Sequence, residues 1–71
     1  MNGVKQVKLI TARKSKGLSR EKAALQIEIS SAAWVSYERG QRMPSLLVAF
    51  KIARLLGVPV DDLFICPDIY S

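Results

Sequence analysis

The stretch SREKAALQIEISSAAWVSYE, residues 19–38, decides the fold of this 71-residue chain. Ser19 and Ser30 each precede a run of residues that favour helix, and a serine hydroxyl can cap the free N–H groups at a helix start. Only Glu28 and Ile29 separate the end of the first run from the second serine. The stretch therefore predicts two short helices that meet at a tight turn.

Further helices are expected on both sides of this stretch. Residues 4–15 form the first, which ends near Gly17 because glycine readily adopts positive φ. Ser45 caps a strongly apolar helix over residues 46–56. Residues 60–64 are expected to make a short fifth helix with acidic residues in its first turn, where the helix dipole favours them. No Asn-Gly or Asp-Gly turn joins two alternating runs, so no strand pair is expected.

The expected fold is thus all-α: one compact five-helix domain over residues 1–64, followed by a short C-terminal tail over residues 65–71. A chain of this length buries only about 60% of its unfolded surface, which argues against a deep cleft. No apolar run approaches the roughly 18 residues of a membrane span, and no signal-peptide core is evident. We therefore expect a cytoplasmic protein without a membrane partner.

The composition excludes much chemistry. The chain has no histidine and a single cysteine, Cys66. An intrachain disulfide, a Cys/His zinc site and an imidazole-activated nucleophile all need residues that are absent. Asp61 and Asp62 are adjacent, so on a helix they point in different directions and do not form a catalytic pair. We expect neither an enzyme nor a metal, a cofactor or a small-molecule substrate.

Charge is unevenly distributed along the chain. Eleven basic residues oppose six acidic ones, for a net charge of +5. Residues 1–22 hold seven of the basic residues and only Glu21 as an acid, whereas the end from Asp61 onward is acidic. This layout favours a polyanionic partner near the first half of the chain. It also fits a solvated basic surface with no particular partner.

The two capped central helices match the geometry of a helix-turn-helix, in which the second helix enters the DNA major groove. Residues around them form a pattern of specific spacing: Gly17-Leu18-Ser19, Ala24, Ile29-Ser30, Tyr37-Glu38-Arg39-Gly40, Pro44-Ser45, Leu56-Gly57-Val58 and Asp62-Leu63-Phe64. This pattern resembles the Cro and lambda-repressor type helix-turn-helix family, also called the XRE family. The resemblance covers about residues 5–64 without a gap through the central helices.

The resemblance implies a double-stranded DNA partner. It implies that the second helix meets a phosphate with its N-terminus and that the third helix reads base edges. The implied base-reading residues are Ser31, Ala32 and Ser36. The implied phosphate contacts are Ser19, Arg20, Arg39, Gly40, Gln41 and Arg42. The last four of these residues would offer their main-chain N–H groups and the guanidinium groups of the two arginines. Arg13 and Glu38 match a family pair that bridges the first and third helices, and Trp34 falls on a core position.

Several of these residues also have plain structural explanations. The serines that precede helices are expected to act as caps before they act as DNA ligands. Arg13 and Glu38 are expected to be structural. Arg39 and Arg42 would also fit ordinary solvated surface charges, although the helix-turn-helix context favours contact with phosphate.

The chain departs from the family pattern at functional positions. Glu28 stands where the turn usually has glycine, so either a side chain adopts positive φ at a cost of about 1 kcal/mol or more, or the turn is reshaped. Arg20 stands where glutamine is common, which strengthens attraction to phosphate. The reading positions offer no Arg, Asn or Gln for bidentate base contacts, so modest sequence specificity is expected.

Apolar residues also occupy positions that are polar in the family pattern. Those in the domain are Val4, Val7, Ile10, Leu25, Leu47 and Val48, and the tail adds Ile65, Ile69 and Tyr70. Clustered apolar side chains on a surface indicate a protein interface. We therefore expect a partner chain, either a second copy or a different regulator.

Two functions follow from these observations. The favoured one is a phage or mobile-element type transcriptional regulator, which occupies operator DNA as a homodimer on half-sites about one DNA turn apart. The alternative is an antirepressor or modulator that binds a partner repressor protein and binds DNA weakly. A membrane-surface helix over residues 4–16 is disfavoured, because its apolar face is narrow and lacks an aromatic anchor.

Overall fold

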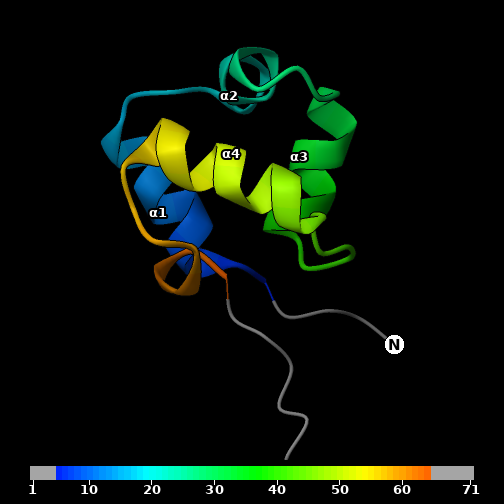
Figure 1. Ribbon diagram of the computed structural model, residues 1–71. Helices are drawn as coiled ribbons and strands as arrows, with labels where there is room; N and C mark the ends of the chain where they lie inside the picture. The colour runs from blue at the N-terminus through cyan, green and yellow to red at the C-terminus, as the bar shows by residue number, and fades with distance from the viewer. Residues whose placement is uncertain (1–4, 65–71) are drawn as a thin grey trace, which may run out of the picture.

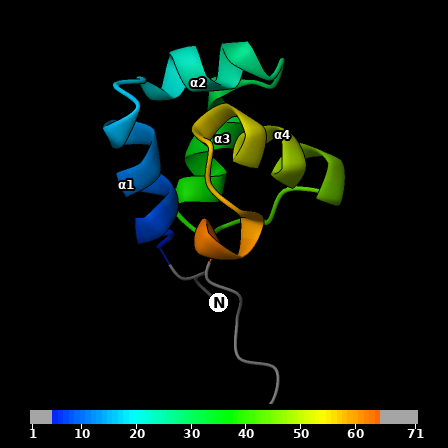
Figure 2. The ribbon, with the colours of Figure 1, turned by 60° about the vertical axis from the view of Figure 1, so that its left-hand side comes forward.

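The computed structural model describes residues 5–64, which form four α-helices and one 3-10 helix (Figure 1). The elements are α1 (Val7–Ser15), α2 (Arg20–Gln26), α3 (Ser31–Glu38), α4 (Leu46–Leu56) and η1 (Val60–Asp62). Figures 1 and 2 show α2 lying across one end of the domain, with α1, α3 and α4 below it. The all-α expectation is confirmed for this part of the chain, which contains no strand.

The first and the last of the five predicted helices differ from the expectation. The expected fifth helix is a single 3-10 turn, held by bonds such as Leu63 N–H to the Val60 carbonyl at 3.0 Å. The segment is too short to repay the nucleation of an α-helix, and Leu63 turns into the core. The first helix begins at Val7 because the preceding N–H, of Gln6, donates to the carbonyl of Glu38 at 2.8 Å. Val4, expected within this helix, lies outside the described residues.

Three serines cap helices as expected. The Oγ atoms of Ser19 and Ser30 each accept a hydrogen bond at 3.0 Å, from the N–H groups of Lys22 and Ala33 respectively. The Oγ of Ser45 accepts one from Val48 N–H at 3.3 Å. Each cap satisfies a donor that the first helical turn leaves free.

Of the two outcomes expected for the turn between α2 and α3, the structure shows positive φ at Glu28. Its φ is +62°, and in the described part of the chain it alone among residues other than glycine has a positive φ. The turn brings the N–H of Ile29 to the carbonyl of Ala24 at 3.0 Å, which ends α2. The two helices of the helix-turn-helix are thus joined without a glycine.

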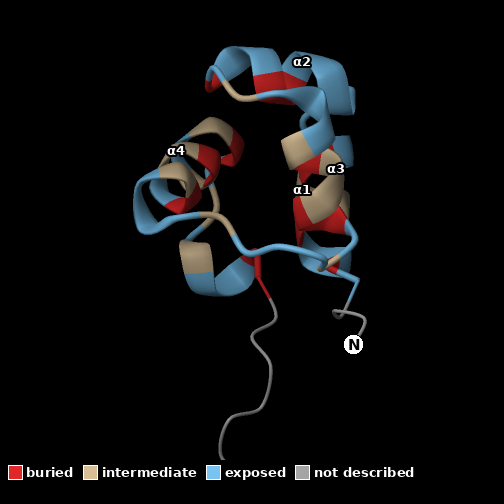
Figure 3. Ribbon diagram, turned by 90° about the vertical axis from the view of Figure 1, so that its right-hand side faces the viewer, coloured by how far each residue is buried: buried red, intermediate tan, exposed pale blue. Residues whose placement is uncertain are grey.

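The core lies where the helices meet. Its largest fully buried apolar side chains are Trp34, Leu9 and Ile52, from three helices, and Leu63, which directly follows η1. Figure 3 shows buried residues on the inner sides of the helices and exposed residues on the outer sides. No helix among residues 5–64 has the length and apolar character needed to cross a bilayer.

Candidate nucleic-acid interface

Helix α3 has a buried and an outward face. Trp34, Tyr37 and Glu38 are buried. A rotation of 100° per residue places two of the predicted base-reading residues, Ala32 and Ser36, on the opposite side, and the third, Ser31, at the N-terminal end of the helix. Ser31 and Ala32 are exposed, and Ser36 is half-buried. This face therefore presents small side chains that let another molecule approach the helix closely.

Residues 39–42 follow α3 and were predicted to contact phosphate. The N–H groups of Arg39, Gly40 and Gln41 donate to the carbonyls of Val35, Tyr37 and Ser36, at 3.0 to 3.1 Å. These three N–H groups close the end of α3, and the predicted phosphate contacts of this segment stay a prediction. The side chains of Arg39, Gln41 and Arg42 are exposed.

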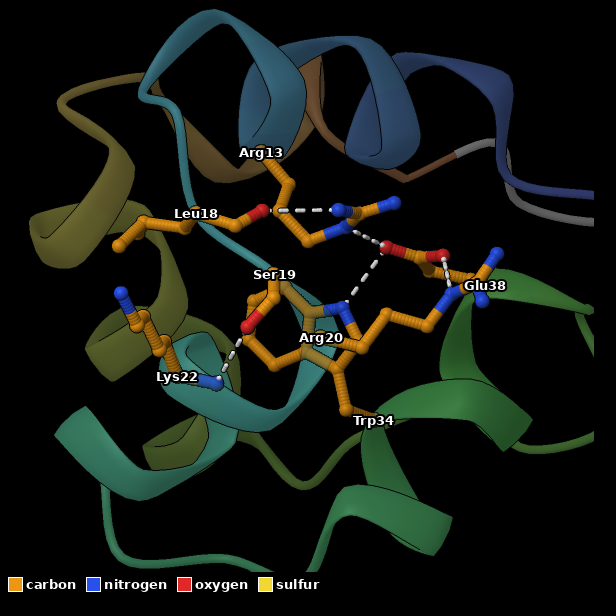
Figure 4. A network of polar contacts seen from close by, with 7 residues as sticks. All are labelled: Arg13, Leu18, Ser19, Arg20, Lys22, Trp34 and Glu38. Carbon is orange, nitrogen blue, oxygen red and sulfur yellow. Dashed lines mark hydrogen bonds and ion pairs between the residues drawn. The ribbon is translucent and has the colours of Figure 1, made fainter.

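Glu38 holds α1, α2 and α3 together through one buried carboxylate (Figure 4). Its Oε2 accepts hydrogen bonds from Arg13 Nε at 2.6 Å and Trp34 Nε1 at 2.7 Å. Its Oε1 accepts one from Arg20 Nε at 2.9 Å. Arg13 also donates from Nη1 to the carbonyl of Leu18 at 2.8 Å. The predicted link between Arg13 and Glu38 is present, and Arg20 and Trp34 extend it.

Burial alone would raise the pKa of Glu38, because a carboxylate loses solvation inside the domain. The hydrogen bonds from Arg13, Arg20 and Trp34 outweigh burial, so the pKa of Glu38 lies below its usual value. In return, Glu38 raises the pKa of Arg20. Glu38 is therefore ionised near neutral pH, and two guanidinium groups against one carboxylate leave a surplus positive charge.

Arg20 takes part in the buried junction and also reaches solvent, and its bond to Glu38 was not predicted. Its Nε is fixed by Glu38, yet its side chain is 50% exposed at the N-terminus of α2. Arg20 and Arg39 line a pocket of about 310 Å³ together with Lys5, Ile10, Val35 and Glu38. Lys5 was absent from the predicted contacts, although it belongs to the basic run of residues 1–22.

The residues of the predicted partner surface are spread over the domain. Val7, Leu25 and Leu47 are exposed, but they lie on three different helices. Val48 packs partly against the core, and Ile10 lines the basic pocket. Three further apolar residues near Leu47 are exposed and were not predicted: Met43, Leu46 and Phe50. The signal was the apolar run LLVAF at residues 46–50, too long for one buried face of a helix.

Known proteins are similar to this chain in sequence. A family model for helix-turn-helix proteins matches residues 9–63. An uncharacterized HTH-type transcriptional regulator of Methanocaldococcus jannaschii is 39% identical over 51 residues, which cover 72% of this chain and 77% of the relative. Another, of Archaeoglobus fulgidus, is 36% identical over 52 residues, which cover 73% of this chain and 74% of the relative.

A solved structure is similar to this chain in both fold and sequence. The restriction-modification controller protein C.AhdI from Aeromonas hydrophila matches with a TM-score of 0.72 and 35% identity, over 80% of this chain and 83% of the controller. The fold, the turn and the Glu38 junction agree with the pattern found in the sequence. The chain therefore belongs to the XRE-type helix-turn-helix family of DNA-binding transcriptional regulators, which are not enzymes.

Proposed function

We propose that this regulator recognises a specific operator sequence by inserting α3 into the DNA major groove. The observation that carries the proposal is the outward face of α3, where small side chains stand at the reading positions while the opposite face is locked to the core. A helix that enters the groove needs such an open face and a rigid support behind it.

The reading face uses simple chemistry. The hydroxyl groups of Ser31 and Ser36 can donate to or accept from base edges, and the methyl group of Ala32 fits against a thymine methyl. None of these side chains makes the bidentate contacts that discriminate most strongly between bases. Specificity is therefore modest for one domain, and two half-sites are needed to increase it.

Phosphate contacts surround the reading face. Glu38 fixes Nε of Arg20, which aims the half-exposed end of that guanidinium away from the core and toward a phosphate. Arg39 and Lys5 line the same pocket and add positive charge. The side chains of Gln41 and Arg42 and the hydroxyl of Ser19 supply further contacts. The contact predicted for Gly40 would use an N–H that also closes α3.

We place this regulator in a phage or a mobile element, as its resemblance to Cro and lambda repressors suggests. The likeness to a restriction-modification controller supports a small regulator that acts on transcription. By occupying its operator, such a protein would block or recruit RNA polymerase. We propose that it does so as a homodimer.

The test is a titration of the protein against a fluorescent duplex taken from beside its own gene, and against a scrambled duplex, over a range of salt concentrations. We expect preference for the native duplex and affinity that falls steeply with salt. Arg42→Ala should weaken binding to both duplexes and lower the salt slope by about one. Arg54→Ala is the matched control: it removes the same charge from α4, where Arg54 lines a pocket with the α2–α3 turn, and should leave the slope unchanged.

A second pair of variants tests base reading. Ser31→Ala combined with Ser36→Ala should reduce the preference for the native duplex while the salt slope stays the same, because the phosphate contacts remain. Equal loss of affinity for both duplexes would contradict base reading by these serines.

A second candidate function is the capture of a partner repressor. The exposed apolar side chains of α4 favour it, since they resemble a protein interface more than a DNA interface. Weak, equal binding to both duplexes, together with a stable complex with a candidate repressor, would support this function over operator binding.

A further inference from the structure

The pocket at the junction of α1, α2 and α3 has the size and shape of a site for a small molecule. It measures about 310 Å³ and is lined by Lys5, Ile10, Arg20, Val35, Glu38 and Arg39. Pockets that bind small molecules in proteins begin at about 300 Å³. The pocket can therefore hold a small organic molecule, but it is too small for a large cofactor.

The charges that line the pocket leave it positive. Lys5, Arg20 and Arg39 are cations, and Glu38 is the single carboxylate among the lining residues, so the net charge of the lining is +2. A phosphate monoester carries a charge of about −1.5 to −2 at pH 7. It would neutralise the pocket, whereas a carboxylate would leave about half of the positive charge uncompensated. The charge of the lining thus favours a phosphate monoester.

Arg20 is held in position before any anion binds. Its Nε donates to Oε1 of Glu38 at 2.9 Å, and Glu38 is itself buried (Figure 4). The Arg20 side chain is still 50% exposed, so its outer nitrogens can donate to an anion in the pocket. A donor that is already oriented loses less conformational entropy when a ligand binds. The junction therefore supplies a preformed anion contact.

Two apolar side chains form the remaining wall of the pocket. Ile10 on α1 and Val35 on α3 both line it, and both are half-buried. A free inorganic anion gains nothing from such a wall. An apolar group attached to the anion would bury its surface there and bind more tightly. The lining as a whole suits a molecule with a phosphate at one end and a small apolar group at the other.

We propose that this pocket binds a small organic phosphate monoester with an apolar group, and that the bound molecule competes with operator DNA. The phosphate would lie between Arg20, Arg39 and Lys5, and the apolar group would lie against Ile10 and Val35. The same three cations are proposed above to bind phosphates of the operator. One set of cations cannot serve both ligands at once, so the molecule would release the regulator from DNA.

The two steps of this inference depend differently on the proposed function. Binding of the monoester does not require that the chain binds DNA, whereas the competition rests on operator binding. Binding is measured without DNA, so the two can fail separately. A chain that binds the monoester but no duplex would support the pocket and overturn operator binding. A chain that binds duplex but no monoester would overturn this inference and leave operator binding standing.

The first experiment is calorimetric titration of the full chain with three probes: phenyl phosphate, inorganic phosphate and phenol. The last two probes each lack one half of the first. We expect phenyl phosphate to bind at one site per chain and at least about tenfold more tightly than either partial probe. Equal affinity for phenyl phosphate and inorganic phosphate would show only general attraction of anions to a basic surface, and it would overturn the inference.

A matched pair of variants locates the site. Arg39→Gln should weaken phenyl phosphate binding about tenfold, because it removes a charge-assisted hydrogen bond. Arg54→Gln is the control: it removes the same charge from α4, where Arg54 lines a different pocket, and should leave the affinity unchanged. Both side chains are exposed, so circular dichroism should show both variants folded. Equal weakening by the two variants would place the anion elsewhere and overturn the assignment.

Val35→Ser tests the apolar wall. It should reduce the preference for phenyl phosphate over inorganic phosphate, while the affinity for inorganic phosphate stays the same. An unchanged preference would overturn the contact between the apolar group and Val35. The comparison of the three probes in the wild type tests the wall independently of the stability of this variant.

The second experiment tests the competition. The protein is titrated against the fluorescent duplex at constant ionic strength, with phenyl phosphate present at about ten times its own Kd. The apparent affinity for the duplex should fall about tenfold, because the two ligands exclude each other. Inorganic phosphate at the same concentration is the control for screening and should have a much smaller effect. An unchanged affinity for the duplex would overturn the competition.

Discussion

Two regions of the domain differ in which side chains they bury: the junction of α1, α2 and α3, and the outer face of α4. The junction buries charged groups, with the carboxylate of Glu38 held by Arg13, Arg20 and Trp34. The α4 face leaves large apolar groups, such as Leu46, in solvent. Each arrangement is costly unless it is compensated, because buried charges need partners and exposed apolar surface needs a cover.

The difference lies in where the compensation comes from. Every buried side-chain nitrogen and oxygen in residues 5–64 has a hydrogen-bond partner within the domain. The junction is therefore complete in one copy, and it contributes to folding. The side chains of Leu46, Leu47 and Phe50 on α4 are exposed within residues 5–64, so they contribute little to the folding of one copy. Substitutions in the two regions should accordingly change different measured quantities.

The largest effect on folding is expected for Glu38→Gln. The amide keeps the shape of the side chain but removes the charge that offsets two guanidinium groups, one of them buried. Loss of one partner from such a buried pair should lower the free energy of unfolding by about 3–5 kcal/mol. Urea denaturation followed by circular dichroism measures this change. Glu21→Gln, in the exposed first turn of α2, is the control and should change stability by about 0.5 kcal/mol or less. A loss at Glu38 no greater than in this control would show that the junction does not stabilise the fold.

The same carboxylate predicts how stability depends on pH. Its pKa is lower in the folded state than the value of about 4.3 in an unfolded chain. A group of this kind stabilises the fold fully above its unfolded pKa, and this contribution is lost as the pH falls through the folded pKa. Unfolding free energy should therefore decrease below about pH 4.3 in the wild type. Glu38→Gln should show a smaller decrease over the same range, and an identical pH profile would assign the acid sensitivity to other groups.

Replacing Glu28 with glycine should have a smaller effect of opposite sign. Glu28 has a φ of +62°, which is unfavourable for a side chain but accessible to glycine. We expect Glu28→Gly to stabilise the domain by up to about 1 kcal/mol in thermal unfolding. Glu21→Gly, inside α2, should instead destabilise it by about 1 kcal/mol. Destabilisation by both variants would show that the turn is not strained.

The sequence predicted local features better than distant contacts. The caps at Ser19, Ser30 and Ser45 and the strained turn at Glu28 depend on neighbouring residues, so their pattern is visible in the chain itself. The link between Arg13 and Glu38 came from a family resemblance, since 25 positions separate the two residues.

The parts that could not be predicted depend on tertiary geometry. That Arg20 shares Glu38 with Arg13 follows from how α2 crosses the other helices, which no local pattern encodes. Periodicity showed that α4 is apolar, but it could not show that η1 leaves Leu46 and Phe50 uncovered. The use of the N–H groups of Arg39, Gly40 and Gln41 to close α3 was likewise not predicted, because it depends on how the helix ends.

The smallest effect on folding is expected for Leu46→Ala, and it completes the comparison. At a protein concentration low enough to keep the chain monomeric, this change should alter the free energy of unfolding by no more than about 0.5 kcal/mol, because the side chain is exposed. Ile52→Ala, on the buried face of the same helix, should cost about 2–5 kcal/mol. If the chain dimerises as proposed and Leu46 lies in the interface, high concentration should stabilise the wild type by mass action and widen its difference in stability from Leu46→Ala. A large difference at low concentration would mean that Leu46 belongs to the core of one copy, and the contrast between the two regions would then fail.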